Sequence, residues 1–162
     1  GAERGAMGEI EERNKAIVQD YLAKLRRGAA EPEHAHGYLD AWSDDIEYIL
    51  PGLWPLGGIY KGKADYLERA MPNYDPNFEK SDDHESDAEG NPGAGLYGYE
   101  YICDGKIVVA MARSRGRDGR GYPDTNTYFL WFEIDDDGKI ERYLDSADFS
   151  SAWQASWGVH LE

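Results

Sequence analysis

The stretch TNTYFLWFEIDDDGKIERYLD, residues 125–145, decides the fold of this chain. Its first part, 125–134, is dense in aromatic and β-branched residues, and 139–145 alternates between apolar and polar ones, as strands do. Between them, Asp136-Asp137-Gly138 is typical of a tight turn, because glycine accepts a positive φ at little cost. The stretch therefore predicts an antiparallel hairpin whose second strand ends on a carboxylate, Asp145.

Further extended segments precede this hairpin. Residues 46–50, 96–102 and 106–114 have the composition of strands, and Asp104-Gly105 is a turn signal between the last two. The segments from residue 96 onward are therefore expected to form a run of antiparallel strands.

Helical spacing dominates the start of the chain. Apolar residues recur from Ile10 to Leu25 with the period of an amphipathic helix, which we expect to end near Arg27-Gly28. Tyr38, Leu39 and Trp42 predict a short second helix. Residues 60–71 predict a turn and a third helix that ends at Pro72, with its inward residues Tyr66, Leu67, Ala70 and Met71. Helices followed by antiparallel strands indicate an α+β fold, with a long N-terminal helix and short helices packed on a curved mixed or antiparallel sheet.

Composition limits the possible partners. The 162 residues carry 17 basic and 32 acidic side chains, a formal net charge of −15, which argues against nucleic acid because phosphate binding needs a surplus of cations. No apolar run has membrane-spanning length, so we expect no membrane partner. A single cysteine, Cys103, allows no internal disulfide and suits the cytoplasm. We expect residues 1–8 to be a tag remnant or disordered, and 9–162 to form a single domain.

Several short motifs occur in a specific order along the chain. They are RNKAIVQDYL (13–22), PGLW (51–54), YKGKADYLERA (60–70), DPNFE (75–79), GYPDTNTYFLWFEI (121–134) and DGKIER (137–142). Together they resemble the SnoaL-like branch of the NTF2-like superfamily, and within it the phenazine-biosynthesis A/B proteins. This resemblance implies a cone-shaped α+β fold, a homodimer, no metal or organic cofactor, and acid–base chemistry on a small biosynthetic intermediate, often polycyclic or carboxylated.

The resemblance also implies a catalytic residue on the last strand. The phenazine proteins have a glutamate acid/base five positions beyond Gly-Lys-Ile, and limonene epoxide hydrolases have an aspartate there; the position is Asp145 in this chain. The histidine of the phenazine family's third helix falls on Arg69, and its helical partner serine falls on Asn73. The arginine–aspartate pair of the epoxide hydrolases is not reproduced, since the corresponding strand reads MARSRG (111–116).

The residues themselves allow two interpretations of Asp145. Strand alternation places it on one face with Glu141 and Tyr143, near Trp131 or Tyr128 of the adjacent strand, where burial would raise its pKa toward neutrality. Alternatively, Asp145 caps a C-terminal helix or pairs with an arginine.

Arg69 is open to two interpretations as well. It can bind a substrate carboxylate or oxyanion, or it can form a surface ion pair with Asp65 or Glu68.

Other side chains are candidates for substrate binding. They are Trp54, Tyr48, Asn73, Tyr143, Asn126 and Arg113. The acidic segment 81–90 fits no EF-hand spacing, so we predict no metal site.

We therefore predict a cofactor-independent acid–base enzyme of natural-product biosynthesis that isomerises, cyclises, dehydrates or condenses a carbonyl or imine intermediate. Its partner would be a small hydrophobic or carboxylated molecule. One alternative is a non-catalytic small-molecule-binding protein. The other is an epoxide hydrolase of the limonene type, which would need Arg113 together with Glu100 or Asp148.

Overall fold

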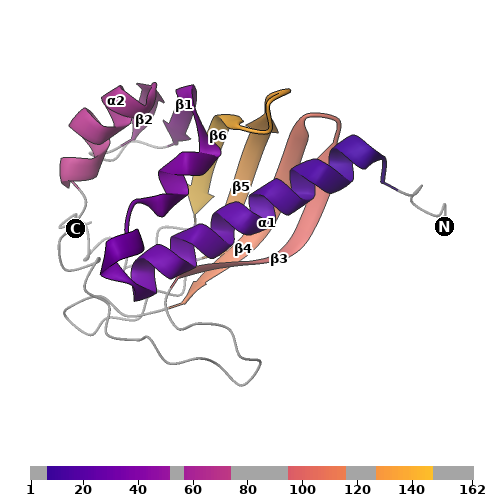
Figure 1. Cartoon of the computed structure of the whole chain (residues 1–162), viewed down its shortest axis with the longest axis horizontal. Coiled ribbons are helices and arrows are strands. Elements are labelled where there is room, and N and C mark those ends of the chain that lie inside the picture. Colours follow the sequence, from indigo (N-terminus) through magenta and orange to yellow (C-terminus); the bar gives the residue numbers. More distant parts are fainter. Residues whose placement is uncertain (1–6, 52–56, 74–94, 116–126, 148–162) are drawn as a thin grey trace, which may run out of the picture.

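The structure is a computed structural model that describes residues 7–51, 57–73, 95–115 and 127–147. Its longest element is α1, Glu9–Ala30, which lies across one face of a sheet (Figure 1). In this part of the chain, no helix has the length and apolar character needed to cross a membrane.

Strands make up most of the described second half. The strands are β1 (Trp42–Leu50), β2 (Gly58–Lys61), β3 (Gly95–Asp104), β4 (Ile107–Arg115), β5 (Thr127–Ile134) and β6 (Ile140–Ala147). They form one six-stranded sheet in the order β2-β1-β6-β5-β4-β3. All neighbours are antiparallel except β1 and β6, which run parallel. The sheet is therefore mixed, and the predicted α+β architecture is confirmed.

Short helical elements connect α1 to the sheet. They are 3-10 turns η1 (Pro32–His34), η2 (Gly37–Ala41) and η4 (Met71–Asn73), the α-helical turn α2 (Lys63–Asp65) and the π-helical turn η3 (Tyr66–Ala70). We predicted a helix through Trp42, but the helical turn ends at Ala41 and Trp42 already starts β1. In segment 60–71 the predicted turn lies at Gly62, with a φ of 91°, after the end of β2. The predicted helix is three short helical turns, α2, η3 and η4.

The core lies between α1 and the face of the sheet that α1 covers, which we call the inner face. Alternating residues of β5 are buried there, and α1 contributes Val18, Tyr21 and Leu22 with helical spacing. Each large apolar side chain of this kind contributes roughly 1.5–3 kcal/mol by leaving water. Asn14 is buried with them, and its Nδ2 donates to the carbonyl oxygen of Gly105 at 3.1 Å.

Two residues predicted to face inward are exposed instead. Ile10, in the first turn of α1, is 57% exposed, and Leu67 is 42% exposed. Tyr66 and Ala70, four residues apart, share the side of η3 that faces the core, and Leu67 lies away from that side. The acidic segment 81–90 and the closing helix beyond Asp148 lie outside the described residues.

Candidate active site

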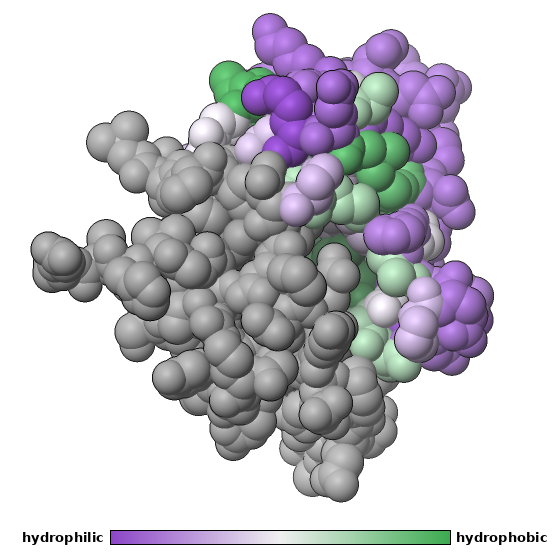
Figure 2. All heavy atoms as spheres, turned by 90° about the vertical axis from the view of Figure 1, so that its left-hand side faces the viewer, coloured by the Kyte–Doolittle hydropathy of each residue, from purple (hydrophilic) through white to green (hydrophobic). Residues whose placement is uncertain are grey.

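Buried aromatic side chains from widely separated elements form one cluster on the inner face. Its members are Tyr21, Tyr38, Trp42, Tyr48, Tyr60, Tyr66, Phe132 and Tyr143. Phe132 and Tyr143 are stacked with ring centroids 4.5 Å apart, and Trp42 meets Tyr66 edge-on at 4.7 Å. Such contacts add stabilisation of about 0.5–1.5 kcal/mol per pair beyond burial. Where the described surface borders the grey atoms, hydrophobic residues come to the surface beside hydrophilic ones (Figure 2).

A β-bulge decides which side chains of β6 join this cluster. Glu133 pairs with Arg142, but the next residue, Ile134, pairs with Ile140, so Glu141 is an extra residue in β6. The prediction that Glu141 shares a face of β6 with Tyr143 and Asp145 is therefore wrong for Glu141. The bulge leaves Tyr143 buried, whereas the Glu141 carboxylate pairs with Lys106 at 2.9 Å.

Asp145 lies beyond Tyr143 on the inner face of β6. Its register partner on β5 is Leu130, which is fully buried. Tyr48 of β1 donates its hydroxyl to Oδ2 of Asp145 at 2.9 Å. Although part of the residue is exposed, burial of the carboxyl raises its pKa from 3.8 to about 6, against the lowering effect of the Tyr48 hydrogen bond.

In the described part of the chain, no arginine or lysine forms an ion pair with Asp145, and none contributes to its pKa. Asp145 is therefore not paired with an arginine among the described residues. The capping interpretation concerns residues outside the described ranges.

Neighbouring phenols are held in their neutral form. Burial raises the pKa of Tyr143 and of Tyr21 well above the ordinary value, and the charge of Asp145 raises both further. The hydroxyls of Tyr38 and Tyr66 lie 2.8 Å apart. Among the described residues, Trp42 Nε1 is buried without a hydrogen-bond partner that meets the usual geometry. The cluster thus surrounds one carboxyl with neutral hydrogen-bonding groups.

Arg69 lies at the surface. Its side chain is 55% exposed and its Nη2 donates to Asp65 Oδ2 at 2.8 Å and to the carbonyl oxygen of Ile59 at 3.1 Å. The guanidinium also lies over the Tyr60 ring, 4.7 Å from its centroid. The hydrogen bond from Arg69 lowers the pKa of Asp65 to about 2. The surface ion pair with Asp65 is therefore formed, and Arg69 makes no contribution to the pKa of Asp145.

The remaining candidates divide into three groups. Tyr48 and Tyr143 lie together with Asp145. Arg113 is exposed, and its guanidinium lies 5.4 Å from the ring centroid of Tyr99. Trp54 and Asn126 lie outside the described residues, as does the side chain of Asn73.

Two residues lie on the outer face of the sheet, contrary to their predicted roles. Trp131 was expected beside Asp145, and Glu100 was a candidate acid for the epoxide hydrolase arrangement. The guanidinium of Arg142 lies over the Trp131 ring, 5.4 Å from the ring centroid. The expectation that Trp131 lies beside Asp145 is therefore wrong. The reason is alternation along β5, which buries Leu130 and Phe132 and turns Trp131 away. Glu100 is exposed and does not join Arg113 to Asp145, as the epoxide hydrolase arrangement would need.

Sequence reasoning did not assign Tyr21, Tyr38 or Tyr66 to the site. The spacing of Tyr21 with Val18 and Leu22 does place it on the buried face of the helix. That spacing, however, indicates a core residue rather than a functional one. Tyr66 meets Tyr48 and Trp42 through the packing of η3 against β1, and no local residue pattern indicates these contacts.

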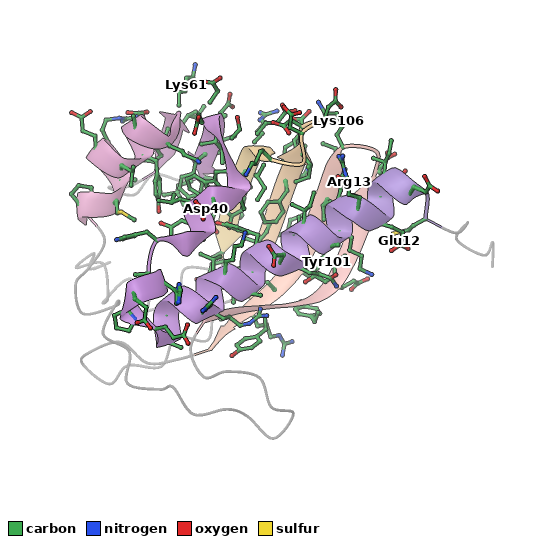
Figure 3. The ribbon with its side chains drawn as sticks, viewed as in Figure 1. Glu12, Arg13, Asp40, Lys61, Tyr101 and Lys106 are labelled. Carbon is green, nitrogen blue, oxygen red and sulfur yellow. The ribbon has the colours of Figure 1, made fainter. Side chains whose placement is uncertain are left out.

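Three cationic side chains lie at the edges of the fold. Lys61 and Lys106 extend away from the cluster, and Arg13 of α1 reaches the β5–β6 turn (Figure 3). There Arg13 donates to the carbonyl oxygens of Asp135 and Asp136 at 3.3 and 3.4 Å. Arg13 thereby connects the helix to the β5–β6 turn, whereas Lys106 pairs with Glu141 at 2.9 Å.

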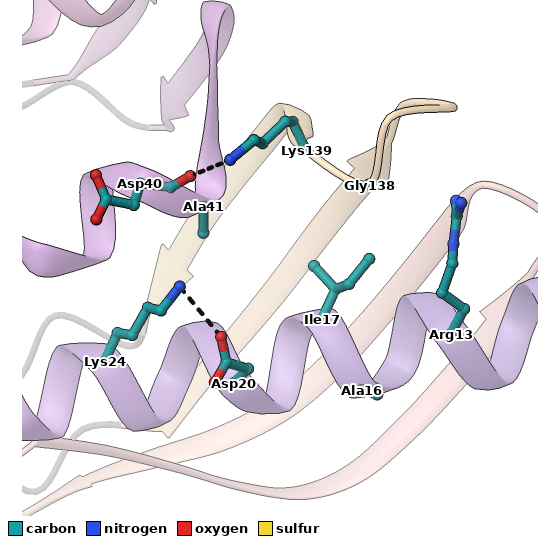
Figure 4. A pocket seen from close by; sticks show the side chains of 9 residues that line it. All are labelled: Arg13, Ala16, Ile17, Asp20, Lys24, Asp40, Ala41, Gly138 and Lys139. Carbon is teal, nitrogen blue, oxygen red and sulfur yellow. Dashed lines mark hydrogen bonds and ion pairs between the residues drawn. The ribbon is translucent and has the colours of Figure 1, made fainter.

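A groove of about 370 Å³ lies between α1, η2 and the β5–β6 turn (Figure 4). Its cations already have partners: Lys139 Nζ donates to the Asp40 carbonyl oxygen at 2.7 Å, and Lys24 pairs with Asp20 at 3.2 Å. We assign no chemistry to this groove.

Among the residues that the structure describes, one group could offer several ligand atoms to a metal ion. Glu31, Glu33 and His34 offer ligand atoms within 4.8 Å of one another on an exposed turn. Arg27, however, lies 2.7 Å from Glu31 Oε2 and 2.8 Å from His34 Nε2, so a cation already occupies these ligands.

Comparisons with known proteins address the fold. No family model matches the chain, and no curated protein matches it. Among solved structures, a protein described as a SnoaL-like polyketide cyclase from Jannaschia sp. CCS1 matches with a TM-score of 0.67 and 14% identity, over 97% of this chain and 100% of the other. TerC, co-crystallised with polyporic acid, matches with a TM-score of 0.63 and 22% identity, over 90% and 98%.

An NTF2-like protein from Burkholderia xenovorans LB400 matches with a TM-score of 0.57 and 20% identity, over 92% of this chain and 98% of the other. The finer likeness to the phenazine-biosynthesis proteins stays a prediction. The helix laid over a mixed sheet and these matches lead to one conclusion: the chain has the fold of the SnoaL-like and NTF2-like proteins.

Proposed function

We propose that this protein is a cofactor-independent acid–base enzyme of small-molecule biosynthesis, with Asp145 as the group that moves the proton. The observation that carries the proposal is a carboxyl on the inner face that is hydrogen-bonded by a buried tyrosine and has no cation as a partner in the described residues. A structural carboxylate in such a place would be expected to have a counter-ion.

The chemistry follows from that environment. A pKa of about 6 lets the Asp145 carboxyl take a proton and return it near neutral pH. The carboxylate would remove a proton from a carbon next to a carbonyl or imine, and the resulting acid would protonate a second position of the same intermediate. Isomerisation, cyclisation, dehydration and condensation of such an intermediate can each proceed from this step.

The aromatic cluster supports a partner with a flat, largely apolar body. The Tyr48 hydroxyl contacts the carboxyl, and the Tyr48 ring lies 5.3 Å from that of Tyr143, centroid to centroid. Trp54, Asn73 and Asn126 stay predictions for the remaining contacts. The likeness in fold to a protein that was crystallised with polyporic acid supports a small molecule as the ligand. A carboxylated substrate held by Arg69 would require the Asp65 ion pair to open.

The proposal is tested by proton exchange at carbon. Purified protein is incubated in D₂O with cyclic ketones of one to three fused rings, and deuterium incorporation next to the carbonyl is followed by NMR. Asp145→Asn is expected to lower the exchange rate roughly 10²- to 10⁴-fold, because the proton acceptor is lost. Asp20→Asn, which removes a surface carboxylate paired with Lys24, is the matched control and should exchange at the wild-type rate.

If Asp145→Asn retains the wild-type exchange rate, Asp145 is not the acid/base. The non-catalytic alternative is favoured by the engagement of Arg69 with Asp65. It predicts that wild-type protein and Asp145→Asn bind the same ketones in a fluorescence titration while neither catalyses exchange.

We also propose that the protein is a homodimer that pairs through the outer face of the sheet. Tyr99, Ile102 and Phe129 on β3 and β5 are 53%, 50% and 50% exposed, which is costly for large apolar side chains left in water. Light scattering is expected to give twice the monomer mass, and Phe129→Glu should return the monomer mass. A monomeric wild type across the micromolar range would contradict this.

A further inference from the structure

The position of the Tyr48 hydroxyl is set by the sheet. In the parallel pairing of β1 with β6, Tyr48 lies opposite Tyr143, two residues before Asp145. The ring is 3% exposed and contacts Trp42, Tyr66 and Tyr143 at centroid distances of 5.2, 5.2 and 5.3 Å. The hydroxyl therefore has little freedom, and it donates to Asp145 Oδ2 at 2.9 Å.

The described polar groups that face Asp145 are phenols, namely Tyr21 from α1, Tyr48 from β1 and Tyr143 from β6. On β5 the residue opposite Asp145 is the apolar Leu130. Within the described ranges, no Lys, Arg, His, Asp or Glu influences its titration. The hydrogen bond from Tyr48 is thus the interaction here that favours the charged form, while burial favours the neutral one.

We propose that Tyr48 is a positioning residue, which holds Oδ2 of Asp145 so that Oδ1 is the oxygen that exchanges the proton. This inference rests on the proposed function of Asp145. When a substrate C–H bond next to a carbonyl breaks, its electron pair forms the enolate and the proton binds Oδ1. The Asp145 carboxyl can exchange this proton with solvent before Oδ1 reprotonates the enolate, so deuterium enters the product in D₂O, and Tyr48 keeps its own proton throughout.

The test measures the titration of Asp145 directly, without a substrate. The carboxyl carbon is followed by ¹³C NMR in aspartate-labelled protein, and the Asp145 signal is assigned by its absence in Asp145→Asn. Tyr48→Phe removes one donor to the charged form, so the Asp145 titration should shift upward by about one pH unit. Tyr60→Phe is the control, because its ring packs on Tyr48 with centroids 6.1 Å apart and it is not among the groups that shift the pKa of Asp145.

A second variant keeps the hydroxyl and the fold. Placing 3-fluorotyrosine at position 48 makes the phenol a stronger donor, so the Asp145 titration should shift downward, opposite to Tyr48→Phe. Unchanged titration with fluorotyrosine, or with a folded Tyr48→Phe, overturns the inference; opposite shifts support it.

The two proposals fail separately. If Asp145→Asn abolishes ketone exchange but the position-48 variants leave the titration unmoved, Asp145 is catalytic and Tyr48 does not position it. If the titration moves as expected but Asp145→Asn exchanges normally, the hydrogen bond is as described and the proposed function is wrong.

Discussion

Two aspartates of this chain show opposite electrostatic behaviour. Asp65 at the surface accepts hydrogen bonds from Arg69 and from the Lys61 backbone N–H, which lower its pKa to about 2. Asp145, on the inner face beside Tyr48, has its pKa raised to about 6 by burial. The same side chain is held charged in one place and driven toward neutrality in the other. The comparison shows that the environment, not the residue type, makes Asp145 the candidate for proton transfer.

The pH dependence of stability should separate the two aspartates, with the larger effect at Asp145. A raised pKa means that the native state favours the protonated form, so stability is lost as pH rises from 3.8 to about 6. Asp145→Asn cannot ionise and keeps an acceptor for Tyr48. It should be more stable than the wild type at pH 8 by about 2–3 kcal/mol and equal to it near pH 3. Urea unfolding at both pH values measures this.

A wild-type protein that is as stable as Asp145→Asn at pH 8 would mean that the Asp145 carboxyl is well solvated. The comparison with Asp65 would then lose its basis.

The effect at Asp65 should be smaller and opposite in sign. Its lowered pKa means that the charged form stabilises the native state above pH 3.8, a contribution that is lost as pH falls toward 2. Asp65→Asn should therefore lower the thermal midpoint slightly at pH 7, because exposed ion pairs contribute little. At pH 2 the two proteins should unfold at similar temperatures, and added salt should narrow the difference at pH 7. A gain in stability at pH 7 would contradict the ion pair's role.

Local sequence patterns predicted much of the architecture. The hairpin of β5 and β6 follows from strand residues around Asp136-Asp137-Gly138, and α1 follows from apolar spacing that a helix needs to bury one stripe. β2 was missed because Gly58–Lys61 is short and exposed at three of its four residues, and so lacks the alternation that signals a strand.

What the sequence by itself determined is the α+β class, the order of its main elements and the position of Asp145 at the end of a strand. Only the tertiary structure decided that Tyr48 would meet Asp145, because they lie far apart in the chain and are joined by the parallel pairing of β1 with β6. The bulge at Glu141 and the π-helical turn at Tyr66 were likewise not predictable from the sequence pattern. Local spacing records the period of an ideal element, whereas packing between elements selects where that period is broken.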